Sequence, residues 1–372
     1  MSSNDPLALG MIGCGGFGLF CLDAFSRIQG VRIVAVADSH APAARQASEK
    51  LGISPCKDAA ELIARKDVDI VHVATPPSGH HELALAAIKA GKHVLCEKPL
   101  AMDLAQADEI LAAADRAGVI APVNFVLRYN QVVDAAKAIV DSRLLGRVLA
   151  GFLTNCAFDT LMPPGHWFWD KSVSGGIFIE HGVHFFDLYA HWLGPGQVVA
   201  ARTEMREGTS QEDRVMCTMR HDGALVSHYH GFDQIKPMDR ADHRLVCELG
   251  DIRVQGWIPL AVTVDAAVDD AAAEQLARCC RGCEVKTVET FDAEHQKMSG
   301  RGQSRKVTRR INLSYCPNSD KQAVYADSIR ALLADQIAFI RDRSHTRRVV
   351  ESNGREALAI AVACAAGESK IV

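Results

Sequence analysis

Short apolar runs alternate with amphipathic segments over the first third of the chain. The runs are LALGMIG, RIVAVAD, DIVHVAT, HVLCE and VIAPVNF, and stretches with helical periodicity, such as HHELALAAIKAG, separate them. Continuous Val, Ile and Ala are typical of strands whose sheet is covered by helices on both faces. The pattern predicts a doubly wound parallel sheet, a Rossmann fold, in residues 1–128.

Beyond residue 128 the pattern changes to longer strands with alternating polarity, such as RVLAGFLTNCAF and RVMCTMRHDGALVSHYH. Asp222-Gly223 and Gly250-Asp251 are expected hairpin turns. Residues 129–372 are therefore predicted to form an α+β domain with a large, mainly antiparallel sheet. Two helices, at about 320–342 and 353–369, are expected to close the chain. The predicted fold class is thus α/β, in two domains.

The composition limits the kinds of molecule that we expect the protein to bind. The chain has 372 residues, 48% of them hydrophobic and 23% charged, with a net charge of −4. Charges of both signs are interspersed, so we expect no nucleic-acid partner. No apolar run approaches the roughly 18 residues of a membrane span, and the first residues do not resemble a signal peptide. We therefore expect a cytoplasmic protein with a small-molecule ligand.

The 12 cysteines are scattered through predicted strands and helices. Such cysteines are usually reduced core residues rather than a disulfide framework. The cluster CCRGC, with Cys279, Cys280 and Cys283, leaves a zinc site open, although no second cysteine pair lies nearby. Its role is not determined by the sequence.

A glycine motif follows the first predicted strand. In MIGCGGFG, Gly13, Gly15 and Gly18 have the G-x-G-x-x-G spacing, and Asp38 ends the second strand 20 residues after Gly18. Such glycines permit a tight turn, a close approach of backbone to pyrophosphate, and close packing of helix on strand. The acidic residue accepts hydrogen bonds from ribose, which favours NAD, although Arg45 leaves NADP open. A glycine turn without a nucleotide is the alternative.

Polar residues follow the next two strands as well. VATPPSGHHE places Thr75, Pro76 and His80 at the carboxyl edge of the sheet, where α/β proteins bind ligands, and CEKPLA places Glu97 and Lys98 there. We expect Thr75, Pro76, His80 and Glu97 to line the cofactor site. An ammonium at Lys98 can stabilise the alkoxide character that develops as hydride leaves carbon. The alternatives are polar helix-start residues and an exposed strand-end lysine.

GCGGFG, VATPPSGHHE, CEKPLA and SGGIFIEHGVHFFD, in this order, resemble the Gfo/Idh/MocA oxidoreductase family over nearly the whole chain. The resemblance implies a Rossmann domain that binds NAD or NADP and a second domain whose open sheet face forms a homodimer or homotetramer. It makes Lys98 the catalytic lysine and Pro99 the residue that sets the local turn. It places the catalytic histidine, which takes the hydroxyl proton, at His184.

The segment around His184 adds candidate substrate residues. Glu180 and Asp187 recur with His184 at spacings of four and three, which predicts one helix face. The family more often has aspartate at the Glu180 position, and Asp187 matches a family acidic position. A solvated helix face and a metal site of Glu180, His181 and His184 are the alternatives. The resemblance is to metal-independent enzymes, so we expect no metal.

Arg128, near the domain junction, and Trp167, shortly before this helix, are further substrate-binding candidates, although a tryptophan is also ordinary core material. The resulting hypothesis is an NAD(P)-dependent dehydrogenase that oxidises a secondary alcohol of a sugar, sugar derivative or inositol. A diene-diol dehydrogenase of aromatic catabolism, an NAD-recycling glycosidase and a nucleotide-sensing regulatory protein remain alternatives.

Overall fold

A computed structural model describes residues 5–367, so the predicted helix end at 368–369 lies outside the described residues. By their internal contacts the described residues form two compact units. The first contains residues 5–128, 162–187 and 325–366, and the second contains 129–161 and 188–324. The sequence divides the chain once, after residue 128, whereas two later segments return to the first unit.

The first unit is built on a four-stranded parallel sheet of order β2-β1-β3-β4. Its strands and the helices between them are β1 (Leu7–Ile12), α1 (Gly16–Phe25), β2 (Val31–Ala37), α2 (Ala41–Leu51), α3 (Ala59–Ala64), β3 (Ile70–Val73), the 3₁₀ turn η1 (Pro77–Gly79), α4 (His80–Lys89), β4 (His93–Cys96) and α5 (Leu104–Ala117).

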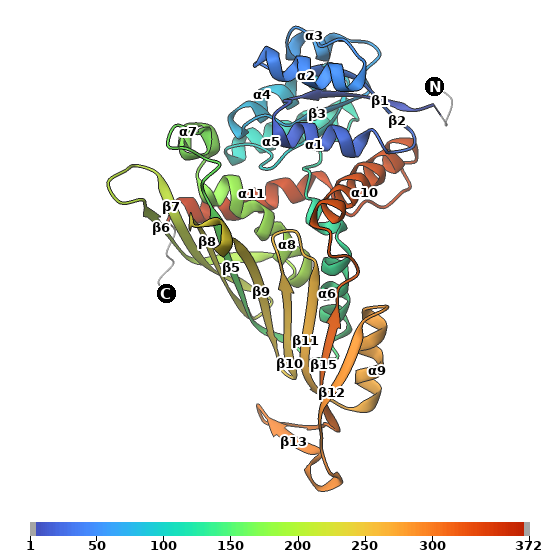
Figure 1. Cartoon of the computed structure of the whole chain (residues 1–372), viewed down its shortest axis with the longest axis vertical. Coiled ribbons are helices and arrows are strands. Elements are labelled where there is room, and N and C mark those ends of the chain that lie inside the picture. The colour runs from blue at the N-terminus through green and yellow to red at the C-terminus, as the bar shows by residue number, and fades with distance from the viewer. Residues whose placement is uncertain (1–4, 368–372) are drawn as a thin grey trace. The chain divides into compact units, whose positions relative to one another are not determined.

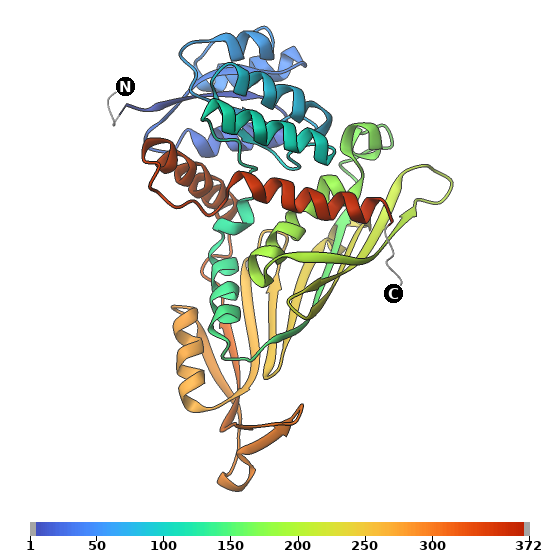
Figure 2. The ribbon, with the colours of Figure 1, turned by 180° about the vertical axis from the view of Figure 1, so that it is seen from behind.

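Helices cover both faces of this sheet, which is why its strands are apolar throughout. Helix α1 lies on one face (Figure 1), while α4 and α5 lie side by side on the other, in front in Figure 2. Leu9, Met11 and Val71 in the strands are fully buried. The predicted Rossmann fold is confirmed. The run VIAPVNF, expected as a fifth strand, forms only a single bridge between Val123 and Cys96.

The later segments of the first unit are helical. They are the 3₁₀ turn η2 (Val126–Tyr129), the 3₁₀ turn η3 (Trp167–Trp169), α7 (Lys171–Ser174), the π-helical turn η4 (Phe178–Gly182), the start of α8 (Val183–Leu193), α10 (Lys321–Arg341) and α11 (Glu351–Ala365). The two predicted closing helices correspond to α10 and α11. No helix among the described residues is long and apolar enough to cross a membrane.

The second unit contains a nine-stranded sheet of order β12-β15-β11-β10-β9-β5-β8-β7-β6, in which only the β5–β8 pair is parallel. Its elements are α6 (Gln131–Ser142), β5 (Val148–Phe158), β6 (Gly196–Met205), β7 (Glu212–His221), β8 (Ala224–Gln234), the 3₁₀ turn η5 (Lys236–Met238), β9 (Arg240–Cys247), β10 (Gly250–Gln255), β11 (Ala261–Val268), α9 (Asp270–Cys279), β12 (Glu284–Thr290), the 3₁₀ turn η6 (Ala293–His295), β13 (Lys297–Gly300), β14 (Gln303–Lys306) and β15 (Arg309–Tyr315).

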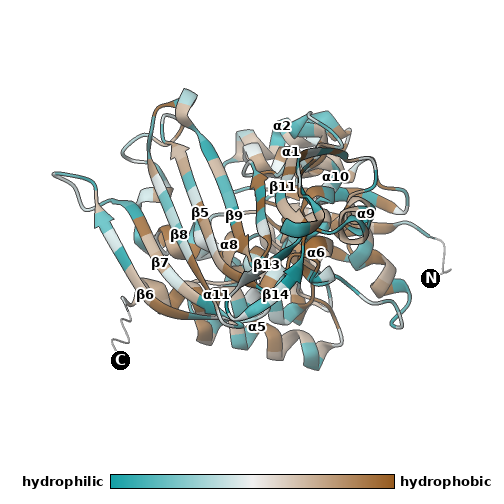
Figure 3. Ribbon diagram, turned by 90° about the horizontal axis from the view of Figure 1, so that it is seen from below, coloured by the Kyte–Doolittle hydropathy of each residue, from teal (hydrophilic) through white to brown (hydrophobic). Residues whose placement is uncertain are grey.

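The strands of this sheet alternate in polarity, as Figure 3 shows for β5, β7 and β8, because one face is buried under helices such as α6 and α9. Asp222 and Gly223 form the predicted two-residue hairpin between β7 and β8. The hairpin expected near Gly250-Asp251 is present between β9 and β10, but its turn lies two residues earlier, at Glu248 and Leu249, because Gly250 pairs with Cys247 and begins β10. A Cβ on Gly250 would lie 2.3 Å from the carbonyl oxygen of Asp265, so this glycine permits close strand approach.

Candidate active site

The glycine-rich turn joins β1 to α1. Gly13 has a φ of +98°, and a Cβ there would lie 2.3 Å from the carbonyl oxygen of Ala74, while a Cβ on Gly18 would lie 2.2 Å from that of Gly13. Gly15 differs, since it caps the N-terminus of α1, is exposed and has open space where a Cβ would be. The turn thus leaves backbone open at a helix N-terminus, where phosphate groups bind.

Asp38 follows β2, and backbone amides fix its carboxylate against the glycine turn. One oxygen accepts a hydrogen bond from the backbone N–H of Cys14 at 2.6 Å, and the other from that of His40 at 2.7 Å. A carboxylate oxygen has further lone pairs, so Asp38 can also accept from ribose hydroxyls. The open backbone at Gly15 and this carboxylate together fit the pyrophosphate and ribose of a dinucleotide.

Lys98 lies two residues beyond β4, and its ammonium is bound by Glu180. The Nζ donates to the backbone carbonyl of Glu180 at 2.8 Å and forms an ion pair with its carboxylate. The two side chains are only 16% and 10% exposed. The Lys98–Pro99 peptide bond is cis. Two residues far apart in the sequence, each proposed from a different motif, are therefore in direct contact.

His80 links the loops that follow β3 and β4. Its Nδ1 lies 2.6 Å from the carbonyl oxygen of Pro99, its Nε2 lies 2.8 Å from that of Thr75, and the side chain is fully buried. Burial lowers the pKa of His80, while the two carbonyls and Glu97 act against that shift. Since both ring nitrogens lie against backbone carbonyls of these loops, His80 joins the two loops, and its contact with a cofactor stays a prediction. Thr75 and Pro76 are more exposed and stay candidate cofactor contacts.

The side chain of Glu97 points into the first unit rather than toward solvent. One carboxylate oxygen lies 3.0 Å from Nε2 of His72 and accepts a hydrogen bond from Nδ2 of Asn124 at 2.7 Å, and Glu97 is only 6% exposed. Any cofactor contact of Glu97 would therefore come from its backbone. No motif in the sequence indicates His72 or Asn124, although each is a polar residue within an apolar run, in DIVHVAT and VIAPVNF.

The segment that carries Glu180 and His184 is not one regular helix. Glu180 lies in the π-helical turn η4, and His184 lies in α8, which begins directly after it. The wider π turn changes the angular spacing that the sequence predicts for one α-helical face, and such turns often occur at functional sites. His184 is 5% exposed. Glu180, which contacts Lys98, and His184 thus belong to one continuous helical segment.

Asp187 and Arg128 bind each other. The guanidinium donates to both carboxylate oxygens, at 2.8 and 2.9 Å, and Asp187 is 2% exposed. Burial raises the pKa of Asp187 to about 6, although Arg128 pulls it down. The sequence named both as substrate-binding residues. Because each side chain binds the other, the pair joins α8 to the segment that follows the Rossmann strands, and contact of either residue with substrate stays a prediction.

Trp167 is half-buried and begins the 3₁₀ turn η3, with its ring 5.3 Å from that of His166. The neighbouring α7 contacts both η3 and η1, the turn directly after Thr75 and Pro76. The tryptophan segment therefore lies beside the loop that follows β3. Trp167 stays a candidate substrate contact on this placement.

The geometry does not support either of the two metal sites that the sequence left open. Within residues 5–367, the only three metal-ligating side chains with ligand atoms close together are Cys21, His72 and Glu97. Neither the Glu180, His181 and His184 set nor the three cysteines near residue 280 forms such a group in that range. The cysteines Cys279 and Cys283 instead donate to backbone carbonyls.

Two family profiles match this chain. The NAD-binding Rossmann-fold domain of the Gfo/Idh/MocA oxidoreductases matches residues 7–125, and the C-terminal domain of the same family matches residues 133–253. The chain belongs to the Gfo/Idh/MocA oxidoreductase family. The membership inferred from the motifs is confirmed, and so is an NAD-binding Rossmann domain.

Relatives of this Gfo/Idh/MocA protein include several enzymes named for sugar or inositol substrates. The chain is 32% identical over 189 residues to a myo-inositol 2-dehydrogenase of Thermotoga maritima, an alignment that covers 50% of this chain and 55% of that protein. It is 35% identical over 176 residues to a 1,5-anhydro-D-fructose reductase of Ensifer adhaerens, covering 46% and 52%. The chain thus spans about half the length of the curated relatives it matches.

Solved structures match the Gfo/Idh/MocA fold over nearly the full length. A levoglucosan dehydrogenase in complex with NADH and L-sorbose gives a TM-score of 0.77 at 19% identity, covering 98% of this chain and 97% of that one. A WlbA dehydrogenase from Bordetella pertussis, with NADH and UDP-GlcNAcA, gives 0.74 at 20% identity, covering 98% and 96%. At these identities the likeness establishes the fold alone.

Proposed function

We propose that the protein is an NAD-dependent dehydrogenase that oxidises a secondary alcohol of a cyclic, polyhydroxylated substrate such as a sugar, sugar derivative or inositol. The observation that carries the proposal is the contact between Lys98, at the end of a Rossmann strand, and Glu180, in the helical segment that also contains His184. A cation from the end of a Rossmann strand thereby contacts the helical segment that carries a carboxylate and an imidazole.

The glycine turn and Asp38 would hold NAD, which when bound would supply a nicotinamide ring able to accept the hydride of the alcohol carbon. His184 takes the hydroxyl proton, because a neutral imidazole nitrogen can act as a general base. Lys98 donates a hydrogen bond to the same oxygen and stabilises the negative charge that grows there in the transition state. Gly13, Gly15, Gly18, Asp38, Thr75 and Pro76 hold the dinucleotide.

Glu180 has two proposed roles. In the structure its carboxylate occupies the ammonium of Lys98, so a substrate hydroxyl must share or replace that partner when it binds. A carboxylate can also accept hydrogen bonds from the other hydroxyls of a polyol, which provides substrate selectivity. The Arg128–Asp187 pair fixes the helix that carries His184, and Trp167 provides an apolar wall.

The names of relatives support this substrate class. The myo-inositol 2-dehydrogenase of Thermotoga maritima and the levoglucosan dehydrogenase complex with L-sorbose are both named for cyclic or polyhydroxylated compounds. NADP remains open, because a structural relative, a biliverdin reductase from Synechocystis, was solved with NADP+.

A homodimer or homotetramer through the sheet of the second unit is part of the proposal. Phe152, Met216 and Leu225 are about half exposed, and the strand register places them on one face of β5, β7 and β8. Exposed apolar side chains on adjacent strands are typical of an interaction surface.

A cytoplasmic location is also proposed, supported by the 12 free cysteines, which suit a reducing compartment.

A substrate panel tests the proposed function. The protein is incubated with NAD or NADP and with sugars, inositols and aromatic dihydrodiols in turn, and NADH or NADPH absorbance is followed. Net reduced cofactor with a sugar or inositol supports the proposal, and net reduced cofactor with the dihydrodiol alone indicates a diene-diol dehydrogenase. Glycoside cleavage without net NADH indicates the cofactor-recycling hydrolase. Tight NAD binding without any turnover indicates a regulatory protein.

A further inference from the structure

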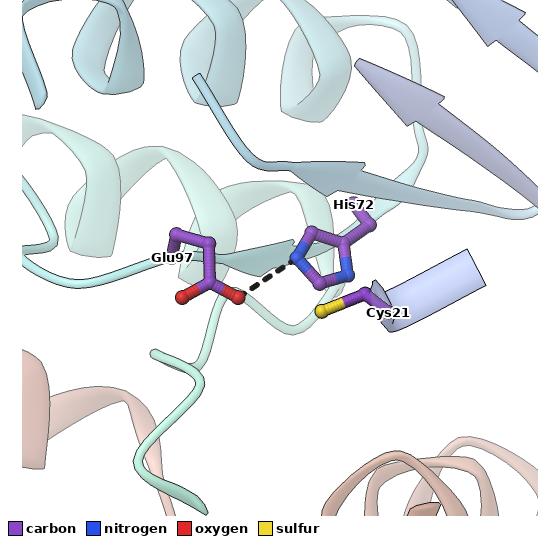
Figure 4. Close-up of side chains that lie close together, drawn as sticks. All are labelled: Cys21, His72 and Glu97. Atoms are coloured by element: carbon purple, nitrogen blue, oxygen red, sulfur yellow. Dashed lines mark hydrogen bonds and ion pairs between the residues drawn. The ribbon is translucent and has the colours of Figure 1, made fainter. Parts of the chain in front are cut away.

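A buried polar cluster includes Glu97, the residue directly before Lys98 (Figure 4). Its members come from three parts of the first unit: Cys21 from α1, His72 from β3 and Glu97 from the residue after β4. His72 and Cys21 are fully buried. A carboxylate in such a place is costly unless hydrogen bonds compensate for the lost water, and the donors here are His72 and Asn124.

Both donors are held by the sheet itself. His72 faces Leu95 in the parallel β3–β4 register, and the backbone N–H of Glu97 donates to the carbonyl of Val73 at 2.9 Å. The backbone N–H of Asn124 donates to the carbonyl of Cys96 at 2.8 Å. The two donors therefore have fixed positions relative to Glu97, and they fix the side chain of the residue that directly precedes Lys98.

The same oxygen of Glu97 accepts from both donors, which assigns the ring proton of His72. Because a carboxylate oxygen can only accept, Nε2 of His72 carries the proton. Nδ1 of His72 and Oδ1 of Asn124 have no hydrogen-bond partner among residues 5–367. Each of the two donor side chains therefore uses a single polar atom, and that atom binds Glu97. This is expected if the cluster serves to bind the carboxylate.

A metal ion is the competing interpretation of the same residues. One ligand atom each from Cys21, His72 and Glu97 lies within 4.8 Å of the others. In the absence of a metal, burial and the nearby Glu97 carboxylate hold the pKa of the Cys21 thiol well above its usual range, so Cys21 is a neutral thiol. The carboxylate oxygen is also already bound by two N–H groups. The hydrogen-bond network therefore accounts for the cluster better than a metal.

We propose that His72 and Asn124 are positioning residues: by binding the buried Glu97 carboxylate they orient the strand-end segment so that the ammonium of Lys98 meets the reacting oxygen. The inference rests on the proposed catalytic role of Lys98. Both side chains are buried, so we expect them to act through Glu97 rather than on the substrate. Since a misplacement of about 1 Å can cost on the order of 100-fold in rate, loss of either donor should lower kcat.

The experiment compares two substitutions at His72. His72→Phe keeps the ring volume but removes the donor, and we expect a roughly 10- to 100-fold lower kcat with NAD affinity changed less than about threefold. His72→Gln places an amide N–H where Nε2 was, and should restore most of the turnover. Asn124→Leu removes the second donor and should reproduce the loss, which decides the question if His72→Phe does not fold. Equal activity of the Phe, Gln and Leu variants and the wild type would overturn the proposal.

Cys21→Ala provides the matched control, because it perturbs the same buried cluster without removing a donor to Glu97. Its turnover should stay within about threefold of wild type, since a small cavity costs stability rather than orientation. A loss equal to that of His72→Phe would indicate a general packing effect and contradict the proposal. So would one equivalent of metal per chain in elemental analysis of the wild-type protein, together with its loss in Cys21→Ala.

A crystal structure of His72→Phe separates this proposal from the proposed function. The distance from Lys98 Nζ to the carbonyl of Glu180, 2.8 Å in the wild type, should increase, and this readout needs no substrate. Unchanged Lys98 geometry contradicts the positioning role even if the protein proves to be a dehydrogenase. Conversely, normal turnover in Lys98→Met removes Lys98 from the reaction, while a displaced Lys98 in His72→Phe still supports the network.

Discussion

The two units bury histidines in different ways. In the first unit, the nitrogens of His72 and His80 bind a carboxylate and two backbone carbonyls close to the carboxyl ends of β3 and β4. In the second unit, His228, His230 and His243 lie within β8 and β9 and are buried.

Aromatic rings surround the histidines of the second unit. The ring of Tyr189 lies 4.6 Å from that of His228 and 5.8 Å from that of His243, and Trp192 lies 5.5 Å from His243. Burial lowers the pKa of His230 and of His243 to about 3. Histidine therefore fixes loops in the first unit and forms part of the core in the second. Substitutions should affect turnover in the first unit and resistance to acid in the second.

The largest expected effect concerns acid stability. Because the folded pKa of His230 lies near 3, below the ordinary 6.5, the neutral ring stabilises the fold above pH 6.5, and this stability is lost as the pH falls toward 3. At about 1.4 kcal/mol per pKa unit, the wild type should lose on the order of 5 kcal/mol relative to His230→Phe over that range. Denaturant unfolding at a series of pH values measures this difference.

His81→Ala is the control for that measurement, since His81 is a partly exposed histidine of the first unit, paired with Glu109. Its unfolding profile should follow that of the wild type. If His230→Phe also follows the wild type, the histidines of the sheet do not limit acid stability, and the contrast between the units fails.

The second prediction concerns Asp187, whose contribution to the free energy of unfolding changes with pH in the direction opposite to that of His230. Burial raises the pKa of Asp187 to about 6, so the fold favours the protonated carboxyl. The stability that this preference contributes is fully present below about pH 4 and is lost as the pH rises through 6. Relative to Asp187→Asn, the wild type should lose about 3 kcal/mol of unfolding free energy between pH 4 and 6. A difference that grows in the other direction would show that Arg128 outweighs burial.

The third prediction tests whether chemistry belongs to the first unit. Lys98→Met and His184→Ala should each lower kcat on the order of 100-fold or more, as expected for loss of a charged donor or a general base. NAD affinity, measured by fluorescence titration, should stay close to wild type and reports folding. His230→Phe at neutral pH should retain normal turnover. Near-normal turnover in Lys98→Met or His184→Ala would remove that residue from the mechanism.

The sequence predicted the strand-end residues of the first unit better than the contacts behind them. The motifs located Gly13, Asp38 and Lys98 because parallel strands bring their carboxyl ends to one edge, a rule that needs no side-chain geometry. The pairing of Lys98 with Glu180 spans 82 positions and includes a π turn, neither of which a local pattern contains. His72 was missed for a related reason, since its partner Glu97 follows a different strand, β4.

In the second unit the alternation of polarity predicted the sheet, but not the position of every turn. Gly250 has the composition of a hairpin turn, yet it begins β10 because its missing Cβ makes room for Asp265 of the adjacent strand. Likewise, the buried histidines look like polar positions in the sequence. Only the strand register shows that they share the inner face with Val226.

The smallest expected effect concerns the choice of cofactor. Asp38 accepts hydrogen bonds from the amides of Cys14 and His40, so its carboxylate is fixed where ribose hydroxyls are expected and where a phosphate would be repelled. Asp38→Ala should weaken NAD binding roughly tenfold and NADP binding less, because only NAD loses a favourable contact. Asp38→Asn keeps an acceptor oxygen without the charge, and should weaken NAD less than Asp38→Ala does while binding NADP more tightly than the wild type. If the wild type itself binds NADP more tightly than NAD, the ribose assignment is wrong, and the exposed Arg45 becomes the residue that selects the cofactor.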